Sequence, residues 1–128
     1  MTTDWDDYPN FHEYEFRCNC GCGKADMAPA FMALLQATRT AYGKPMTITS
    51  GYRCPEYNTK VSSTGMDGPH TSGKAVDVSV SRKDAHALLA LSTGVYSGIG
   101  IQQKGVGRFI HLDTLTPDEA PRPTIWSY

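Results

Sequence analysis

Hydrophobic and polar positions recur with a helical period in some segments of the chain and with a two-residue period in others. Between Asp26 and Tyr42 apolar residues recur at helical spacing, which predicts an amphipathic helix. Asp26 can cap its start, Pro29 is tolerated in the first turn, and Gly43 suits its end. A second helical pattern covers residues 85–91, after a polar segment that resembles an N-terminal cap. The pattern therefore predicts two main helices.

Other segments have the two-residue period or the β-branched side chains that are typical of strands. Residues 46–50 are rich in β-branched side chains, and residues 75–80 alternate in polarity. Residues 96–102 and 108–114 predict two more strands, joined as a hairpin by Gly-containing residues. One or two helical turns are expected at 55–60. Strands separated by helices and followed by a hairpin predict an α+β fold, with a small antiparallel or mixed sheet flanked by helices.

Length and charge exclude several classes of protein. The 128 residues predict one domain, 1–128, because a chain of this length buries roughly two-thirds of its unfolded surface. The net charge is -1 and no run of Lys or Arg occurs, so we expect no nucleic-acid partner. No apolar stretch reaches the length of about 18 residues that a transmembrane helix needs, so we expect no membrane insertion. We also expect a monomer.

The two ends of the chain differ in composition from the middle. Residues 1–25 predict an irregular arm with aromatic anchors, and the Pro-rich tail at 115–128 is expected to pack on the body through Trp126. The first seven residues are acidic and polar, unlike the basic and then apolar segments of a signal peptide. We therefore expect synthesis in the cytoplasm without a signal peptide.

Three polar residues are candidate metal ligands. His70 lies on a glycine-rich loop, and Asp77 lies inside the apolar strand pattern, where a carboxylate needs a partner or a metal. His111 is surrounded by apolar residues of the last predicted strand. Taken singly, His70 could be a surface residue and His111 a satisfied core histidine. Together, two imidazoles and a carboxylate suit a catalytic zinc ion, which takes three protein ligands and keeps a fourth position for water. This set predicts an enzyme.

Four cysteines form a second group with possible metal chemistry. Three of them are separated by single residues and the fourth is distant: Cys18, Cys20, Cys22 and Cys54. They could form a structural zinc site, although gaps of about two to four residues are more usual. Reduced thiols in a Gly-rich turn, or a disulfide to Cys54, are the other interpretations, and without a signal peptide a disulfide is not the default. A link to Cys54 would tie the amino-terminal arm to the loop of Arg53.

Three sequence blocks occur in order along the chain: Ser50-Gly51-Tyr52-Arg53, then His70 with Gly73, Ala75 and Asp77, then Phe109-Ile110-His111-Leu112-Asp113. Their order and separations resemble the signature blocks of the zinc D-Ala-D-Ala carboxypeptidase family. That family includes phage endolysin peptidases, and its fold is shared with the hedgehog signalling domain. The resemblance spans residues 50–113, and the helix and tail that flank them also look like small single-domain members. It implies a hedgehog/DD-peptidase-like fold and zinc ligation by His70, Asp77 and His111.

The resemblance also implies a role for Arg53 and leaves the general base open. Arg53 matches a family arginine that polarises the scissile carbonyl or binds a substrate carboxylate, and a guanidinium suits both tasks. Many relatives place an Asp or Glu three residues before the last histidine ligand, but here Arg108 stands there. Asp113 could instead be the base, or it could orient the ligand imidazole. Asp67 and Glu56 are further candidates for the base.

These inferences predict a zinc-dependent peptidoglycan peptidase that hydrolyses an amide bond in cell-wall stem peptides. A phage or prophage lysis endopeptidase is the preferred setting, with the enzyme reaching the wall during host-cell lysis or in a virion. Zn²⁺ is the expected cofactor, and a second, structural ion is possible. Tyr52 and Trp126 could line the substrate groove or could be core aromatics. The alternatives are a D-Ala-D-Ala carboxypeptidase and a non-catalytic metal-bearing binding module.

Overall fold

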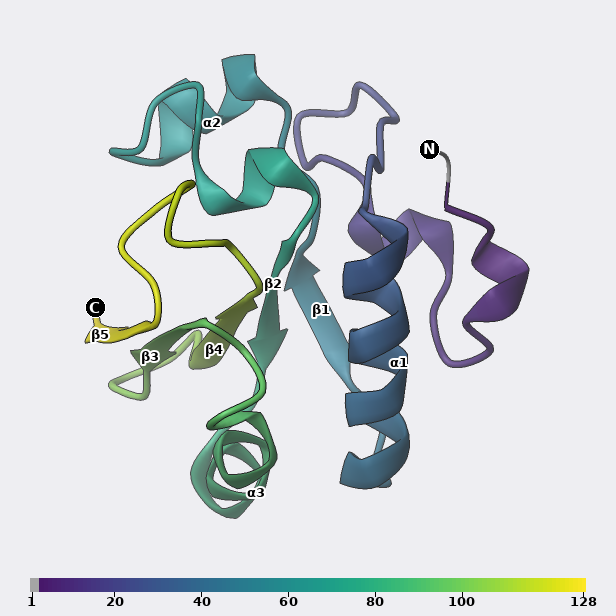
Figure 1. Ribbon diagram of the computed structural model, residues 1–128, viewed down its shortest axis with the longest axis vertical. Coiled ribbons are helices and arrows are strands. Elements are labelled where there is room, and N and C mark those ends of the chain that lie inside the picture. The colour runs from purple at the N-terminus through teal and green to yellow at the C-terminus, as the bar shows by residue number, and fades with distance from the viewer. Residues whose placement is uncertain (1–2) are drawn as a thin grey trace.

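The computed structural model describes residues 3–128, and five strands in this range form one mixed sheet (Figure 1). The strands are β1 (Thr47–Ser50), β2 (Ala75–Ser79), β3 (Gly98–Gln102), β4 (Phe109–Asp113) and β5 (Thr124–Ser127). Their order across the sheet is β1-β2-β4-β3-β5. Neighbouring strands are antiparallel, except that β3 and β5 are parallel. The predicted α+β class and the hairpin of β3 and β4 are confirmed.

Helices surround this sheet. The α-helices in the described range are α1 (Pro29–Tyr42), α2 (Pro55–Val61) and α3 (Arg82–Ser92). Short 3-10 helices also occur: η1 (Trp5–Asp7), η2 (Glu13–Phe16) and η3 (Pro69–Ser72). The predicted helices are present, but α1 begins after Ala28 and Asp26 does not cap it. Pro29 explains this start, because a proline suits the first helical position, where no N–H is needed.

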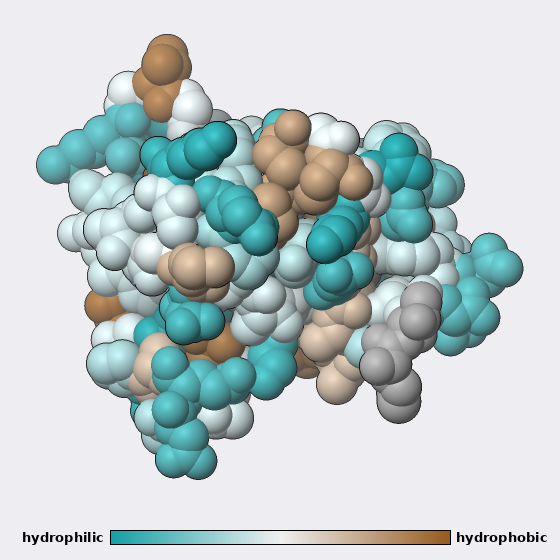
Figure 2. Space-filling model, turned by 90° about the horizontal axis from the view of Figure 1, so that it is seen from above, coloured by the Kyte–Doolittle hydropathy of each residue, from teal (hydrophilic) through white to brown (hydrophobic). Residues whose placement is uncertain are grey.

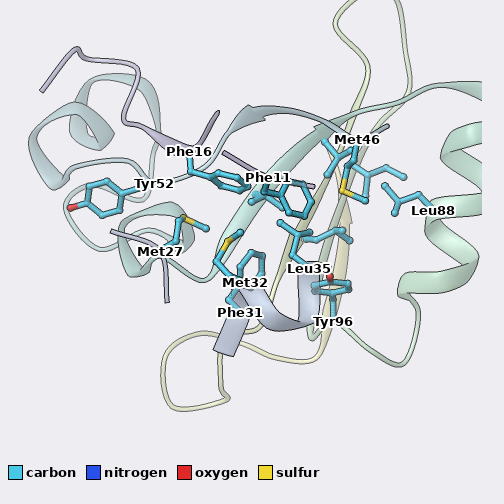
Figure 3. Close-up of a cluster of buried hydrophobic side chains, with 14 of the residues drawn as sticks. Phe11, Phe16, Met27, Phe31, Met32, Leu35, Met46, Tyr52, Leu88 and Tyr96 are labelled. Carbon is cyan, nitrogen blue, oxygen red and sulfur yellow. The ribbon is translucent and has the colours of Figure 1, made fainter. Parts of the chain in front are cut away.

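One face of the sheet packs on the hydrophobic core. Val76 and Val78 of β2 lie opposite Leu112 and Ile110 of β4, and all four side chains are buried. The same cluster holds side chains from the arm and α1, among them Phe11, Phe16, Phe31, Met32 and Leu35 (Figure 3). Each fully buried side chain of this size contributes about 1.5–3 kcal/mol. Because side chains alternate along a strand, the residues between these apolar positions face the other side of the sheet.

The carboxyl-terminal tail returns to that other side of the molecule. Residues 124–127 form β5 beside β3, a strand that the sequence pattern did not predict. In this register Trp126 pairs with Gly100.

Seen from above, the surface is mainly hydrophilic, with small and separate hydrophobic areas (Figure 2). Within residues 3–128 no helix has the length and apolar character required to cross a membrane.

Candidate metal centre

The three candidate ligands come together on the polar side of the sheet. Asp77 of β2 and His111 of β4 are direct cross-strand partners, and η3 brings His70 beside them. The Oδ1 atom of Asp77 lies 3.4 Å from Nε2 of His70 and 3.1 Å from Nδ1 of His111. One ligand atom from each residue lies within 4.8 Å of the other two. The sheet register and one short helix therefore build the cluster.

The separations of the donor atoms fit a zinc ion. Zinc binds nitrogen and oxygen ligands at about 2.0–2.1 Å in a tetrahedron, which places neighbouring ligand atoms about 3.3 Å apart. The two measured separations from Asp77 Oδ1, 3.1 Å and 3.4 Å, lie on either side of this value. Two imidazoles and one carboxylate are also a donor set that zinc accepts in catalytic sites. The residues present therefore fit the metal.

A hydrogen bond fixes the ring of His70. Its Nδ1 lies 2.9 Å from the carbonyl oxygen of Gly51, so Nδ1–H donates and Nε2 keeps its lone pair for a metal. The backbone N–H of Arg53 donates in turn to the carbonyl oxygen of His70, at 3.2 Å. His70 is only 5% exposed. The loop at 51–53 thus holds η3 and sets which ring nitrogen faces Asp77.

His111 is fixed by a buried chain of charged groups. Its Nε2–H donates to Oδ2 of Asp113 at 2.7 Å, which leaves Nδ1 to face Asp77. Asp113 is completely buried and also accepts two hydrogen bonds from Arg122, from Nε at 2.9 Å and from Nη2 at 2.7 Å. A carboxylate that holds the far nitrogen of a ligand imidazole fixes its orientation and raises its basicity. Arg122 therefore positions Asp113, and Asp113 positions His111.

The electrostatics of the cluster favour a cation. Burial raises the pKa of Asp77, but its interactions with the adjacent rings of His111 and His70 outweigh this effect and hold the pKa well below its usual value. Burial likewise raises the pKa of Asp113, and His111 and Arg122 outweigh it and lower the pKa to about 2. Both carboxylates are therefore ionised near neutral pH. They supply negative charge next to two imidazoles, as a dication requires.

Two glycines of β3 make room on this side of the sheet. A Cβ atom at Gly98 would collide with the carboxylate of Asp113, and one at Gly100 would collide with the indole of Trp126. The indole consequently lies with its centroid 5.0 Å from that of the His111 ring. Glycines at alternate strand positions indicate such close approach, so the sequence itself contains a signal for these two contacts.

A cavity of about 800 Å³ opens beside His111. The tail forms part of its wall through Arg122, Trp126 and Tyr128, and the loop before η3 contributes Asp67. Trp126 thus lies where a groove residue was predicted. Arg122 was not predicted at all, because nothing in a Pro-rich segment indicates that it returns to a buried carboxylate.

Tyr52 and Arg53 follow Gly51, and neither residue is part of this cavity wall. Tyr52 is 8% exposed and belongs to the hydrophobic core (Figure 3), so the predicted groove role for it is wrong and the core interpretation holds. Arg53 is half-buried, and its guanidinium donates to Oδ1 of Asn58 at 2.9 Å and to Oγ of Ser50 at 3.1 Å. These two acceptors leave other N–H groups of Arg53 available. Its role toward substrate stays a prediction.

The structure places the candidates for the general base in different surroundings. Asp113 contacts the nitrogen of His111 that faces away from Asp77 and is closed off by Arg122, which favours an orienting role. Arg108 donates to the carbonyl oxygen of Gly105 and lines a different cavity. Asp67 is exposed on the wall of the cavity beside His111. Glu56 is exposed on α2 and does not line that cavity.

The four cysteines also come together. Their sulfur atoms lie within 4.8 Å of one another, and all four thiols are free: Cys18, Cys20, Cys22 and Cys54. The Sγ atom of Cys54 lies 3.6 Å from those of Cys18 and Cys20. The arm is therefore in contact with the loop that follows Arg53.

A comparison with known protein families covers the region that contains both clusters. The family model for peptidase M15 matches residues 9–113, a range that holds all three candidate ligands and all four cysteines. No curated protein matches the sequence at a significant level. The match covers most of the chain, and the matched region has the donor set of a zinc centre. The chain therefore belongs to the peptidase M15 family, whose members are zinc peptidases of the D-Ala-D-Ala carboxypeptidase type.

Proposed function

We propose that this M15 peptidase is a zinc-dependent endopeptidase that hydrolyses an amide bond within peptidoglycan stem peptides. One observation carries the proposal: His70 Nε2, Asp77 Oδ1 and His111 Nδ1 converge beside an open cavity. The other nitrogen of each imidazole is already held by a hydrogen bond. Three protein ligands leave one tetrahedral position for water, as in catalytic zinc sites.

The residues of the chain prepare this site before substrate arrives. The Gly51 carbonyl and the Asp113 carboxylate hold the two imidazoles in the tautomers that ligation needs. When bound, zinc lowers the pKa of its water and polarises the peptide carbonyl. Arg53 has a permanent charge and N–H groups beyond those given to Ser50 and Asn58, which suit a developing oxyanion or a substrate carboxylate.

The cavity supports an extended substrate. Its wall includes Trp126, Tyr128 and the loop before η3, and its volume of about 800 Å³ gives room for several residues of a stem peptide. Aromatic side chains offer broad apolar contact to the aliphatic parts of such a peptide. These features favour cleavage within the stem over removal of its last residue.

Proton transfer is assigned to Asp67. Two carboxylates line the cavity, and Glu119 is engaged by the ammonium of Lys74 and by Thr116. Asp67 is exposed and has no such ion pair among the salt bridges of the described residues. In this assignment Asp67 takes a proton from the attacking water and returns it to the leaving amine.

The cell wall is the proposed site of action, and lysis by a phage or prophage is the proposed setting. The resemblance of the sequence blocks to those of phage endolysin peptidases supports both proposals, and the M15 family match supports a peptidoglycan-type substrate.

Digestion of purified peptidoglycan tests the function. Protein stripped with a chelator and reloaded with Zn²⁺ should release free amines from the walls, and stripped protein should not. Mass analysis of the products identifies the bond. Cleavage inside the stem supports the endopeptidase, and loss of only the terminal D-Ala supports the carboxypeptidase instead.

Matched variants make this digestion specific to the site. Asp77→Asn should abolish amine release, whereas Asp84→Asn, the same change in an exposed surface ion pair with Lys44, should not. If zinc-loaded wild-type protein binds walls and releases no amine, the proposal fails and a non-catalytic binding module is the better description.

A further inference from the structure

Four thiols from two distant parts of the chain converge at one point. Cys18, Cys20 and Cys22 lie in the arm before α1, and Cys54 is the residue that precedes α2. Figure 1 shows this arm segment beside the chain that enters α2. Their sulfur atoms all lie within 4.8 Å of one another.

The sulfur separations fit a tetrahedral ion better than a disulfide. A zinc–sulfur distance of about 2.3 Å gives a tetrahedron with edges of about 3.8 Å. The Sγ atom of Cys54 lies 3.6 Å from Cys18 Sγ and also 3.6 Å from Cys20 Sγ. A disulfide would select one partner at about 2.05 Å. Here one sulfur is equally distant from two others, as at the corner of a four-sulfur site.

The backbone of the arm explains how closely spaced cysteines can share one site. In extended chain, residues two apart lie on one face but about 7 Å apart. Gly21 and Gly23 have φ angles of 90° and 81°, in the left-handed region that glycine tolerates, and they fold the segment back on itself. The N–H of Cys18 donates to the carbonyl of Lys24 at 2.8 Å and closes the turn.

The surroundings of the sulfurs suit a structural ion. The backbone N–H of Cys54 points at Sγ of Cys18 at 3.3 Å, so it can stabilise a thiolate. Cys18 and Cys54 are buried, while Cys20 and Cys22 are exposed. Four sulfur ligands would fill a tetrahedral zinc ion and leave no position for water, which is the pattern of structural sites.

We propose that Cys18, Cys20, Cys22 and Cys54 bind one structural Zn²⁺ ion, separate from the candidate catalytic centre. This ion fastens the arm to the loop at 51–54. The same loop supplies the Gly51 carbonyl that orients His70, and the Tyr52 N–H is bound to the arm through the carbonyl of Phe16 at 3.0 Å. The structural ion therefore also supports the geometry of the catalytic site, a consequence that rests on the proposed function.

Cobalt substitution tests the site without any activity measurement. Stripped, reduced protein loaded with Co²⁺ should show thiolate-to-cobalt charge-transfer absorption, because the candidate catalytic centre contains no sulfur. Asp77→Asn should keep this absorption, and Cys18→Ser/Cys54→Ser should lose it. Zinc content should be two ions per chain in the wild type and one in each variant. No charge-transfer absorption in folded wild-type protein, or a disulfide in its intact mass after purification under reducing conditions, would overturn the proposal.

A second measurement tests the supporting role of the ion. In the folded Cys20→Ser variant, zinc affinity of the catalytic centre should fall about tenfold, as expected when groups that orient a ligand are loosened. Amine release should return toward the wild-type rate at saturating zinc. Unchanged affinity would remove the supporting role, while the cobalt spectrum would still decide whether the cysteine ion exists. If neither protein releases amines but the cobalt spectrum is as expected, the proposed function fails and the structural ion stands.

Discussion

The two clusters of metal-ligating residues differ in what holds them. Asp77 and His111 stand opposite each other on neighbouring central strands, and the imidazoles of His70 and His111 are each braced by a second hydrogen bond. The cysteines lie instead on a turn of the arm and before a helix, braced by a few backbone groups. A sheet fixes side-chain positions more firmly than a turn does. We therefore expect the histidine–aspartate site to keep its shape without metal and the cysteine site to lose it.

The clusters also differ in the number of ligands and in access. Three ligands beside a cavity leave a coordination position for water and substrate, whereas four sulfurs leave none. In the first site, His70 and His111 are buried, while Asp77 is partly exposed. We therefore infer that the histidine–aspartate cluster is arranged for chemistry and the cysteine cluster for support.

The largest effect is expected from Asp77→Asn. The change removes the charged ligand between the two histidines, so amine release from peptidoglycan should fall by orders of magnitude and about one zinc ion per chain should be lost. Metal analysis beside an amine assay measures both. Near-normal turnover in this variant would mean that the three residues are not the catalytic centre.

Asp113→Asn should damage both stability and zinc binding. It leaves the Arg122 guanidinium buried opposite a neutral amide and removes the acceptor that orients His111. Removing one partner of a buried pair costs about 3–5 kcal/mol, and loss of an orienting carboxylate weakens metal affinity about 10–100-fold. Denaturant unfolding and zinc titration check these values.

The matched control for Asp113→Asn is Asp118→Asn, an exposed carboxylate of the same tail. Asp118→Asn should change neither the free energy of unfolding nor the affinity for zinc. The orienting role would be contradicted if Asp113→Asn kept full zinc affinity while its turnover at saturating zinc collapsed, because that is the behaviour of a general base.

Gly100→Ala should displace the tail without removing any ligand. The new Cβ would collide with the indole of Trp126, and overpacking of this kind costs about 1–3 kcal/mol. KM for stem peptides should rise while zinc content stays normal. Adding Trp126→Leu to this variant relieves the collision and should recover stability but not KM. Equal KM in all of these proteins would show that the tail wall does not contact substrate.

The smallest effect concerns a core contact that belongs to neither cluster. The buried hydroxyl of Tyr96 lies 2.7 Å from Oγ1 of Thr38, and burial raises the pKa of Tyr96 to about 12. The raised pKa means that the neutral phenol is favoured in the folded protein. The contribution of the buried Tyr96 phenol to the free energy of unfolding is complete below the ordinary pKa of 10.0 and is lost as pH rises toward about 12.

Tyr96→Phe should therefore flatten the alkaline fall in stability, at a cost of about 1 kcal/mol near neutral pH. Unfolding curves between neutral and alkaline pH measure this, and zinc content should be unchanged. A fall in stability as steep as that of the wild type would assign the alkaline sensitivity to another group.

Local patterns predicted which side of the sheet two of the three candidate ligands would face, because those two lie in strands with a clear period. Asp77 interrupts an alternating strand, and His111 occupies the polar phase of another, so strand alternation alone puts both on one side of the sheet. The resemblance of the three blocks supplied His70, which its loop could not identify by itself.

Partners that depend on tertiary contacts could not be predicted in this way. Arg122 reaches Asp113 only because β5 pairs with β3, and no periodicity marks that short strand. The pattern likewise does not say that Tyr52 turns into the core while Arg53 does not. The gathering of Cys54 with the arm depends on the packing of distant segments, which spacing along the chain does not encode.

Anomalous X-ray diffraction at the zinc absorption edge, from crystals of the zinc-loaded protein, tests the central claim most directly. The account predicts a peak within bonding distance of His70 Nε2, Asp77 Oδ1 and His111 Nδ1, with a second peak among the four cysteine sulfurs. The account would be contradicted by the absence of a peak between the three residues. It would also be contradicted by a zinc ion bound to Nε2 of His111, the nitrogen that donates to Asp113 in this structure.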